Sequence, residues 1–254
     1  MFRGAMAGEG NLTGVQNTAV GTEALESDTD GCRNTAIGYR SLFTQDFTTG
    51  TNSSNTAVGW QSGTSITTGV SNTLIGSEAG DALTDADYNI AIGHEALSAD
   101  TKGSNSVAVG MGALFNQNFT TATSVYNTAV GHAAGNQITT GVQNTLIGGL
   151  AGDALTTGGE NVAVGYNALH SDTKGVGSVA IGRNALYYQN LSTTTTTYNT
   201  AVGISAGLSI TTGNAHTIIG GLAGDALTDA DDNVVLGVAA LSSDTKGSHT
   251  TAIG

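Results

Sequence analysis

Two turns of the chain are crowded with carboxylates and have the clearest potential to bind a ligand. Oxygen ligands that lie close together in sequence can bind Ca²⁺. The matching turn at Asp153 lacks the Asp-Ala-Asp sequence of the other two, and the chain contains neither an EF-hand nor a nonapeptide calcium repeat. The sequence therefore favours solvated acidic turns over a calcium site. The acidic residues are Asp81, Asp85 and Asp87 in the first turn and Asp225, Asp229, Asp231 and Asp232 in the second.

The remaining reactive side chains do not form a catalytic arrangement. The five histidines lie at scattered positions and lack the paired spacing of a zinc site. Cys32 has no histidine at an equivalent place, so a thiol nucleophile is not expected. No strand is followed by the Gly-Lys-Ser/Thr ending of a phosphate loop. We therefore expect a non-enzymatic protein with no catalytic residue, no metal and no cofactor.

A pentapeptide related to Asn-Thr-Ala-Val-Gly recurs fourteen times and must position all of these residues. Its glycines are 17 residues apart, but every fourth step is lengthened to 21, which adds a second period of 72. A 17-residue unit cannot fold alone and completes its core by stacking on its neighbours. Residues 1–254 are therefore expected to form one repetitive array within a longer fibre protein, with residues 1–16 as an atypical N-terminal segment.

The three residues before each repeat glycine predict a β-strand. The residue just before the glycine is always aliphatic, as in Val20, the preceding one is usually alanine, as in Ala19, and the third is β-branched. Side chains alternate along a strand, so both faces must be apolar. Leucines four residues after the glycine, such as Leu25, are expected to cover one face. The alanine row is expected to pack against another copy of the chain.

Asparagine stands four residues before most of the repeat glycines. Stacked one coil above another, these side chains would form an amide ladder in which each bonds to the next. This structural role is favoured over ligand binding because the residue recurs in most coils. The ladder residues are Asn17, Asn34, Asn55, Asn72, Asn89, Asn127, Asn144, Asn161, Asn199 and Asn233.

The longer repeats carry much of the aromatic content. Two interpretations remain open: the aromatic segments form surface loops that contact a carbohydrate or receptor, or they pack over a neighbouring coil or chain and fix the register of an oligomer. The residues concerned are Phe43, Phe47, Phe115, Phe119, Tyr187 and Tyr188.

Composition and charge narrow the partners. The 38 glycines do not follow a three-residue period and proline is absent, which excludes collagen. Twenty acidic and seven basic residues give a net charge of −13, which disfavours nucleic acid and anionic membrane surfaces. No stretch has the length and hydrophobicity of a transmembrane helix, so no direct membrane insertion by this segment is expected.

Two repeat units, at residues 105–110 and 177–182, resemble the Ser-Val-Ala-Ile-Gly repeats in the head domains of trimeric autotransporter adhesins. The Asn-Thr-Ala-Val-Gly form also resembles repeats of phage tail-fibre proteins. The first resemblance implies a left-handed parallel β-roll within a homotrimer. The coils of 17 and 21 residues are longer than the adhesin repeat.

We expect an all-β parallel β-solenoid of about fourteen coils that serves as a structural or adhesive segment of a fibre. Its expected location is extracellular, on a cell surface or on a virion. Its expected partners are copies of itself, with a trimer favoured, and a cell-surface glycan or receptor. One alternative is an ice-binding solenoid, suggested by the threonine row that includes Thr18 and Thr35. The other is a carbohydrate-active β-helix enzyme, which should break the repeat with a local cluster of acids and bases.

Overall fold

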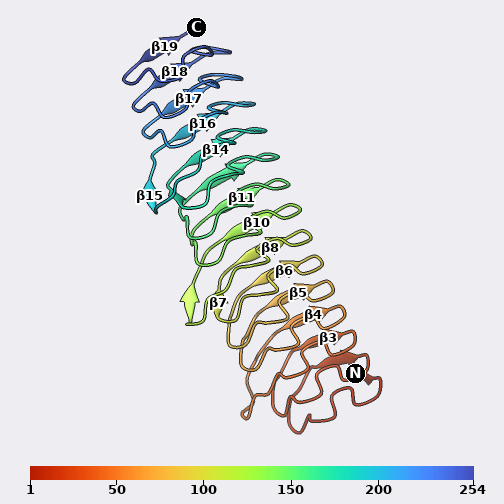
Figure 1. Cartoon of the computed structure of the whole chain (residues 1–254). Helices are drawn as coiled ribbons and strands as arrows, with labels where there is room; N and C mark the ends of the chain where they lie inside the picture. The colour runs from red at the N-terminus through yellow and green to blue at the C-terminus, as the bar shows by residue number, and fades with distance from the viewer. The chain divides into compact units, whose positions relative to one another are not determined.

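The computed structural model describes residues 1–254, apart from the side chain of Phe2. The chain is all-β and without helix: short parallel strands stack into a β-solenoid of about 14 turns with about 17 residues per turn, which confirms the predicted fold class (Figure 1). It divides into two compact units, Met1–Tyr126 and Asn127–Gly254, each a run of stacked coils.

The first unit stacks its main strands in chain order, each parallel to the next. Equivalent residues pair across coils, so that Thr18 lies beside Thr35 and Thr73 beside Ile90. A second, shorter parallel pair joins β7 (Gly103–Ser104) to β9 (Thr123–Ser124). The main strands are β1 (Phe2–Arg3), β2 (Thr18–Val20), β3 (Thr35–Ile37), β4 (Thr56–Val58), β5 (Thr73–Ile75), β6 (Ile90–Ile92) and β8 (Val107–Val109).

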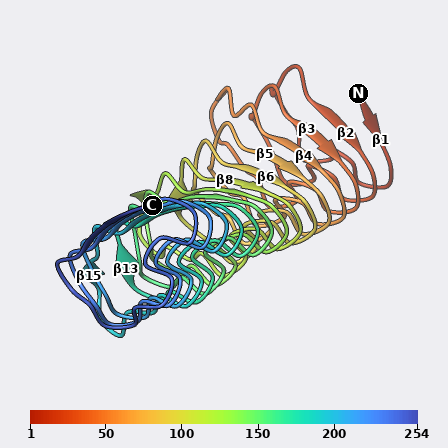
Figure 2. The same cartoon turned by 90° about the horizontal axis from the view of Figure 1, so that it is seen from above.

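The second unit repeats this arrangement, and its coils appear as overlapping loops in Figure 2. Here β13 (Gly175–Val176) pairs in parallel with β15 (Thr195–Thr196). The main strands are β10 (Thr128–Val130), β11 (Thr145–Ile147), β12 (Val162–Val164), β14 (Val179–Ile181), β16 (Thr200–Val202), β17 (Thr217–Ile219), β18 (Val234–Leu236) and β19 (Thr251–Ile253).

The atypical segment of residues 1–16 follows the same backbone path as the repeats. Strand β1 pairs in parallel with β2, with Arg3 beside Val20. Gly4 has a φ of 135°, close to the 133° of the repeat glycine Gly21. The segment therefore departs from the repeat in sequence and not in backbone conformation.

The alanine row lies inside the solenoid, so the prediction that it packs against another copy is wrong. Ala19, Ala36 and their equivalents are fully buried within their own coils, whereas the flanking strand residues are half-buried or exposed. The expected alternation of faces is present, but the small residue points inward. Leucines from the opposite side of the coil, such as Leu25 and Leu42, fill the space in front of it.

The interior alternates between two packing arrangements, where position +n denotes the residue n places after the repeat glycine. Two successive coils carry leucine at +4 and a polar residue at +7, and the next two carry glycine at +4 and a larger aliphatic at +7. A Cβ added to Gly80 would lie 2.8 Å from a methyl carbon of Leu74 and 2.9 Å from one of Leu83. The two positions therefore exchange bulk, and this exchange produces the longer period. The +7 residues are Asp28, Gln45, Asp100, Gln117, Asp172 and Gln189 in the leucine coils and Ile66, Leu83, Ile138, Leu155, Ile210 and Leu227 in the glycine coils.

The repeat glycine combines a left-handed backbone with a close approach between coils, as its position at the end of the strand predicts. Gly148 has a φ of +135°, and a Cβ on it would lie 2.5 Å from the carbonyl oxygen of Gly165 in the next coil. Both the backbone strain and the collision exclude a side chain there. The adjacent Gly149 is different, because the nearest atom to an added Cβ is a ring carbon of Tyr166 at 3.5 Å.

This adjacent pair of glycines gives a matched stability test. Gly148→Ala should lower the free energy of unfolding by about 1–3 kcal/mol or more, because the alanine is strained and the coils must separate. Gly149→Ala should leave it within about 0.5 kcal/mol of the wild type. Chemical denaturation followed by circular dichroism measures both. Equal effects of the two substitutions would contradict the close coil contact at Gly148.

Candidate functional site

The outward face of the main strands is the most regular surface of the molecule. In each coil the first and third strand residues point away from the interior, so a β-branched row and an aliphatic row run side by side. Ile75 and Ile147 are 38% and 40% exposed. The aliphatic row, called here the outer aliphatic row, is a stripe of large apolar side chains that nothing else in the chain covers. Its members are Val20, Ile37, Val58, Ile75, Ile92 and Val109 in the first unit, and Val130, Ile147, Val164, Ile181, Val202, Ile219, Leu236 and Ile253 in the second.

The asparagines form a buried ladder whose bonds run mainly to the backbone. The N–H of Asn72 donates to Oδ1 of Asn55 at 2.9 Å, and the amide nitrogen of Asn72 donates to the carbonyl of Ala86 at 2.8 Å. The same two bonds recur along the column, for example at Asn144. Direct amide-to-amide contacts of 3.2–3.3 Å occur as well, as between Asn72 and Asn55. Each side chain therefore ties its own coil to the next one and satisfies buried main-chain groups.

His216 replaces asparagine in this ladder and reproduces its bonding. Its Nε2 lies 2.7 Å from the carbonyl oxygen of Ala230, and its Nδ1 accepts the N–H of Asn233 at 3.3 Å. Because a carbonyl can only accept, the neutral tautomer with hydrogen on Nε2 fits the site. Burial lowers the pKa of His216 from its ordinary value of 6.5, although the contact with Ala230 opposes the shift. A proton on Nδ1 would face another donor.

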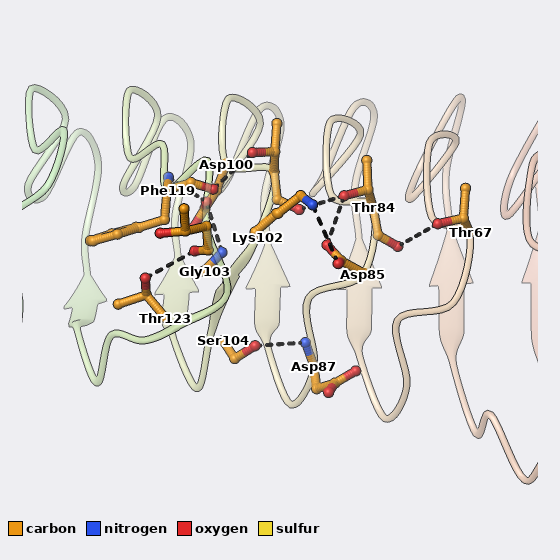
Figure 3. A network of polar contacts seen from close by, with 12 residues as sticks. Thr67, Thr84, Asp85, Asp87, Asp100, Lys102, Gly103, Ser104, Phe119 and Thr123 are labelled. Carbon is orange, nitrogen blue, oxygen red and sulfur yellow. Dashed lines mark hydrogen bonds and ion pairs between the residues drawn. The ribbon is translucent and has the colours of Figure 1, made fainter.

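A buried carboxylate marks each place where a longer coil begins. Oδ1 of Asp100 accepts the N–H groups of Gly103 and Phe119, both at 3.0 Å, and Oδ2 accepts the amide of Gln117 at 2.6 Å (Figure 3). Asp28 and Asp172 make the equivalent bonds. Burial raises the pKa of the Asp28 and Asp100 carboxyls, while these hydrogen bonds oppose the shift. Sequence analysis assigned these aspartates to turns and missed their burial.

The predicted aromatic segments pack mostly against the solenoid. Phe47 and Phe119 are buried, and Phe43, Phe115 and Tyr187 are half-buried. Of the six candidates, Tyr188 alone is exposed. These positions favour packing over projection. The exposed residues of the longer coils are instead the small ones that follow, at 48–50, 120–122 and 192–194.

Sequence analysis overlooked an exposed aromatic pair. The rings of Tyr39 and Trp60 stack at a centroid distance of 6.4 Å and an interplanar angle of 22°. The guanidinium of Arg40 lies over the rings of Tyr39 and Phe43 and pairs with Glu23. Both aromatic residues occupy position +1 of neighbouring coils, and the shared repeat position is the signal that would have found them.

The acidic turns are held by protein partners. Asp87 accepts the N–H of Val70 at 2.8 Å, and Asp85 lies 3.5 Å from Nζ of Lys102 (Figure 3). The second turn repeats both contacts, with Asp231 accepting the N–H of Asn214 and Asp229 lying 3.7 Å from Nζ of Lys246. His249 lies 3.4 Å from Asp232. These carboxylates therefore serve as links between coils.

One group of side chains in the described part of the chain brings three potential metal ligands together. The donor atoms of Glu78, His94 and Glu95 all lie within 4.8 Å of one another. Burial raises the pKa of nearby Asp81 to about 6, and the charges of Glu78 and Glu95 add to the shift. Sequence analysis treated the histidines as scattered and missed this cluster. The 17-residue spacing of Glu78 and Glu95 was the available signal.

The comparisons give no relative from which a function could be transferred. No family model, no curated protein and no solved structure matches this chain. Within the described residues there is also no helix with the length and hydrophobicity to cross a bilayer.

His216 predicts a pH dependence of stability with a defined sign. The unfolded chain takes up a proton near pH 6.5, whereas the folded chain resists it to lower pH because its pKa is depressed. The contribution to the free energy of unfolding is therefore complete above pH 6.5 and is lost as the pH falls below it, by at most about 1.4 kcal/mol per pH unit.

His216→Asn should restore the usual ladder bonds and remove this component, so the variant should lose less stability than the wild type between pH 8 and pH 5. Thermal unfolding at several pH values measures the difference. His132→Asn, at an exposed histidine, is the control and should follow the wild type. A wild-type profile that His216→Asn leaves unchanged would disprove the assignment.

Proposed function

We propose that this chain is a non-enzymatic segment of an extracellular fibre, on a cell surface or virion, and that several copies, most simply three, pack together through the outer aliphatic row. The observation that supports this proposal is the uncovered row itself. Its spacing repeats with every coil, so an identical row on a second subunit can match it residue by residue. Large apolar stripes of this kind mark interaction surfaces.

The flanking row supports the same use of the face. Positions such as Thr18 and Thr73 place short β-branched side chains beside the aliphatic residues. Their hydroxyls make the border of the stripe polar without adding charge. A flat face with an apolar centre and an uncharged edge suits close packing between subunits.

The same proposal assigns adhesion to the side chains that point away from this face. Tyr39, Trp60 and Arg40 offer stacked rings and a cation at the surface. Aromatic side chains combine an apolar ring with a polar group and suit contact with a glycan or a protein receptor. A solenoid that repeats such positions along its coils would display them to a partner.

The proposed assembly predicts a defined mass and a defined way to disrupt it. Light scattering after size-exclusion chromatography should give about 76 kDa for a trimer of the 25.2 kDa chain. Ile147→Asp should shift the protein toward monomer, because it places a charge in an apolar contact. Ile204→Asp is the matched control: Ile204 is 54% exposed but lies outside the row. A wild-type monomer at all concentrations, or an Ile147→Asp variant that assembles normally, would refute the proposal.

Ice binding is a second candidate because the threonine row faces outward. Thr18, Thr35, Thr56 and Thr73 occupy four successive coils in register, and Ile90 continues the row. Their side chains repeat about every 4.8 Å along the coils. The rows together form a flat array of hydroxyl and methyl groups.

Thermal hysteresis tests this candidate, and Thr56→Tyr should abolish it, whereas Thr121→Tyr at an exposed loop should not. Absence of hysteresis in the wild type would eliminate ice binding. The two proposals are distinguishable because a face buried between subunits cannot also contact ice.

A further inference from the structure

We propose that Glu78, His94 and Glu95 form a binding site for one divalent transition-metal ion of the Zn²⁺ type. The site lies within the first unit, on the outer surface of two successive coils. Nε2 of His94 is 3.9 Å from Oε2 of Glu78, and its Nδ1 is 3.4 Å from Oε2 of Glu95. The donor atoms of all three residues lie within 4.8 Å of one another. Small side-chain adjustments can therefore bring them around one ion.

The solenoid holds the two glutamates in place before any ligand arrives. Both occupy position +2, with left-handed φ values of 56° and 54°. The N–H of Glu78 donates to the carbonyl of Trp60 at 2.9 Å, and that of Glu95 donates to the carbonyl of Ser77 at 3.0 Å. The carboxylates thus start from a fixed backbone spacing, which reduces the entropy lost when a metal binds.

The electrostatics of the cluster favour a cation. At the same coil position elsewhere, Glu23 faces Arg40 and forms an ion pair. In the described residues no lysine or arginine pairs with Glu78 or Glu95, and their basic neighbour is His94. A third carboxylate, Asp81, feels the charges of both glutamates, and its Oδ1 is buried without a hydrogen-bond partner. The local excess of negative charge is what a bound cation would neutralise.

The donor set selects the class of metal. One imidazole nitrogen with two carboxylate oxygens suits zinc and neighbouring transition metals, whereas Ca²⁺ and Mg²⁺ prefer oxygen ligands alone. His94 is half exposed, so water can complete a four-coordinate shell. The bound ion would cross-link the coils that carry Glu78 and Glu95.

Titration of the full chain with Zn²⁺ by calorimetry, after removal of metal with a chelator, tests the site. The wild type should bind one equivalent, and Zn²⁺ should raise its thermal unfolding midpoint. His94→Ala, Glu78→Gln and Glu95→Gln should each weaken binding at least about tenfold, since even the loss of an outer-shell partner has that effect. Co²⁺ should give visible absorption bands in the wild type that His94→Ala lacks. Ca²⁺ at the same concentration should neither bind nor shift the midpoint.

His132→Ala is the matched control, because His132 occupies the same position +1 of its coil but has Ala133 and Leu150 where the cluster has its glutamates. It should bind Zn²⁺ as the wild type does. Circular dichroism confirms that each variant is folded before titration. Absence of saturable binding near one equivalent would overturn the proposal. Equal affinities of the wild type and His94→Ala would also overturn it.

Discussion

The structure depends on one constraint: each coil must follow the same backbone path as the next, because its main-chain hydrogen bonds are made between coils. The N–H of Thr73 donates to Asn89 one coil ahead, and the N–H of Gly76 donates to Val58 one coil behind, both at 2.8 Å. Any change of path in one coil would leave buried donors and acceptors unpaired on both sides. The repeated glycine, with its left-handed backbone and its contact with the next carbonyl, follows from this requirement.

Polar residues enter the interior only where the neighbouring coil satisfies them. The asparagine ladder uses both ends of each amide, and His216 does the same with two ring nitrogens. The buried Asp100 and Gln117 pair belongs to the leucine coils, where the +4 side chain supplies the apolar bulk and position +7 is free for a polar group. The longer period of the sequence is therefore a packing period, in which two kinds of coil interior alternate and the longer coil begins at the carboxylate.

Function in such a protein falls to the side chains that point outward, since the inward ones are occupied with packing and hydrogen bonding. Every outward position repeats in neighbouring coils, so residues 17 or 21 places apart become neighbours. This geometry places Tyr39 beside Trp60 and Glu78 beside Glu95 without any loop or pocket. It also produces the outer aliphatic row, whose regularity is the basis for the proposed assembly.

The sequence by itself determined the all-β class, the position of each strand, the coil length and the column of asparagines. These features were readable because a solenoid depends on contacts between equivalent residues at a fixed separation, which appear as a period. The alternation of strand faces was also readable, since it follows from backbone geometry.

Only the tertiary structure decided which strand face is inside, because both faces of Thr-Ala-Val are apolar enough to be buried. It placed Ala19 inward and Val20 outward, since the leucines across the coil leave room only for a small side chain. It also decided that Asp28 and Phe47 are buried and that His94 meets two glutamates. Such outcomes depend on how a coil bends between its strands, and that bending is set by packing across the interior, which no local pattern in the sequence records.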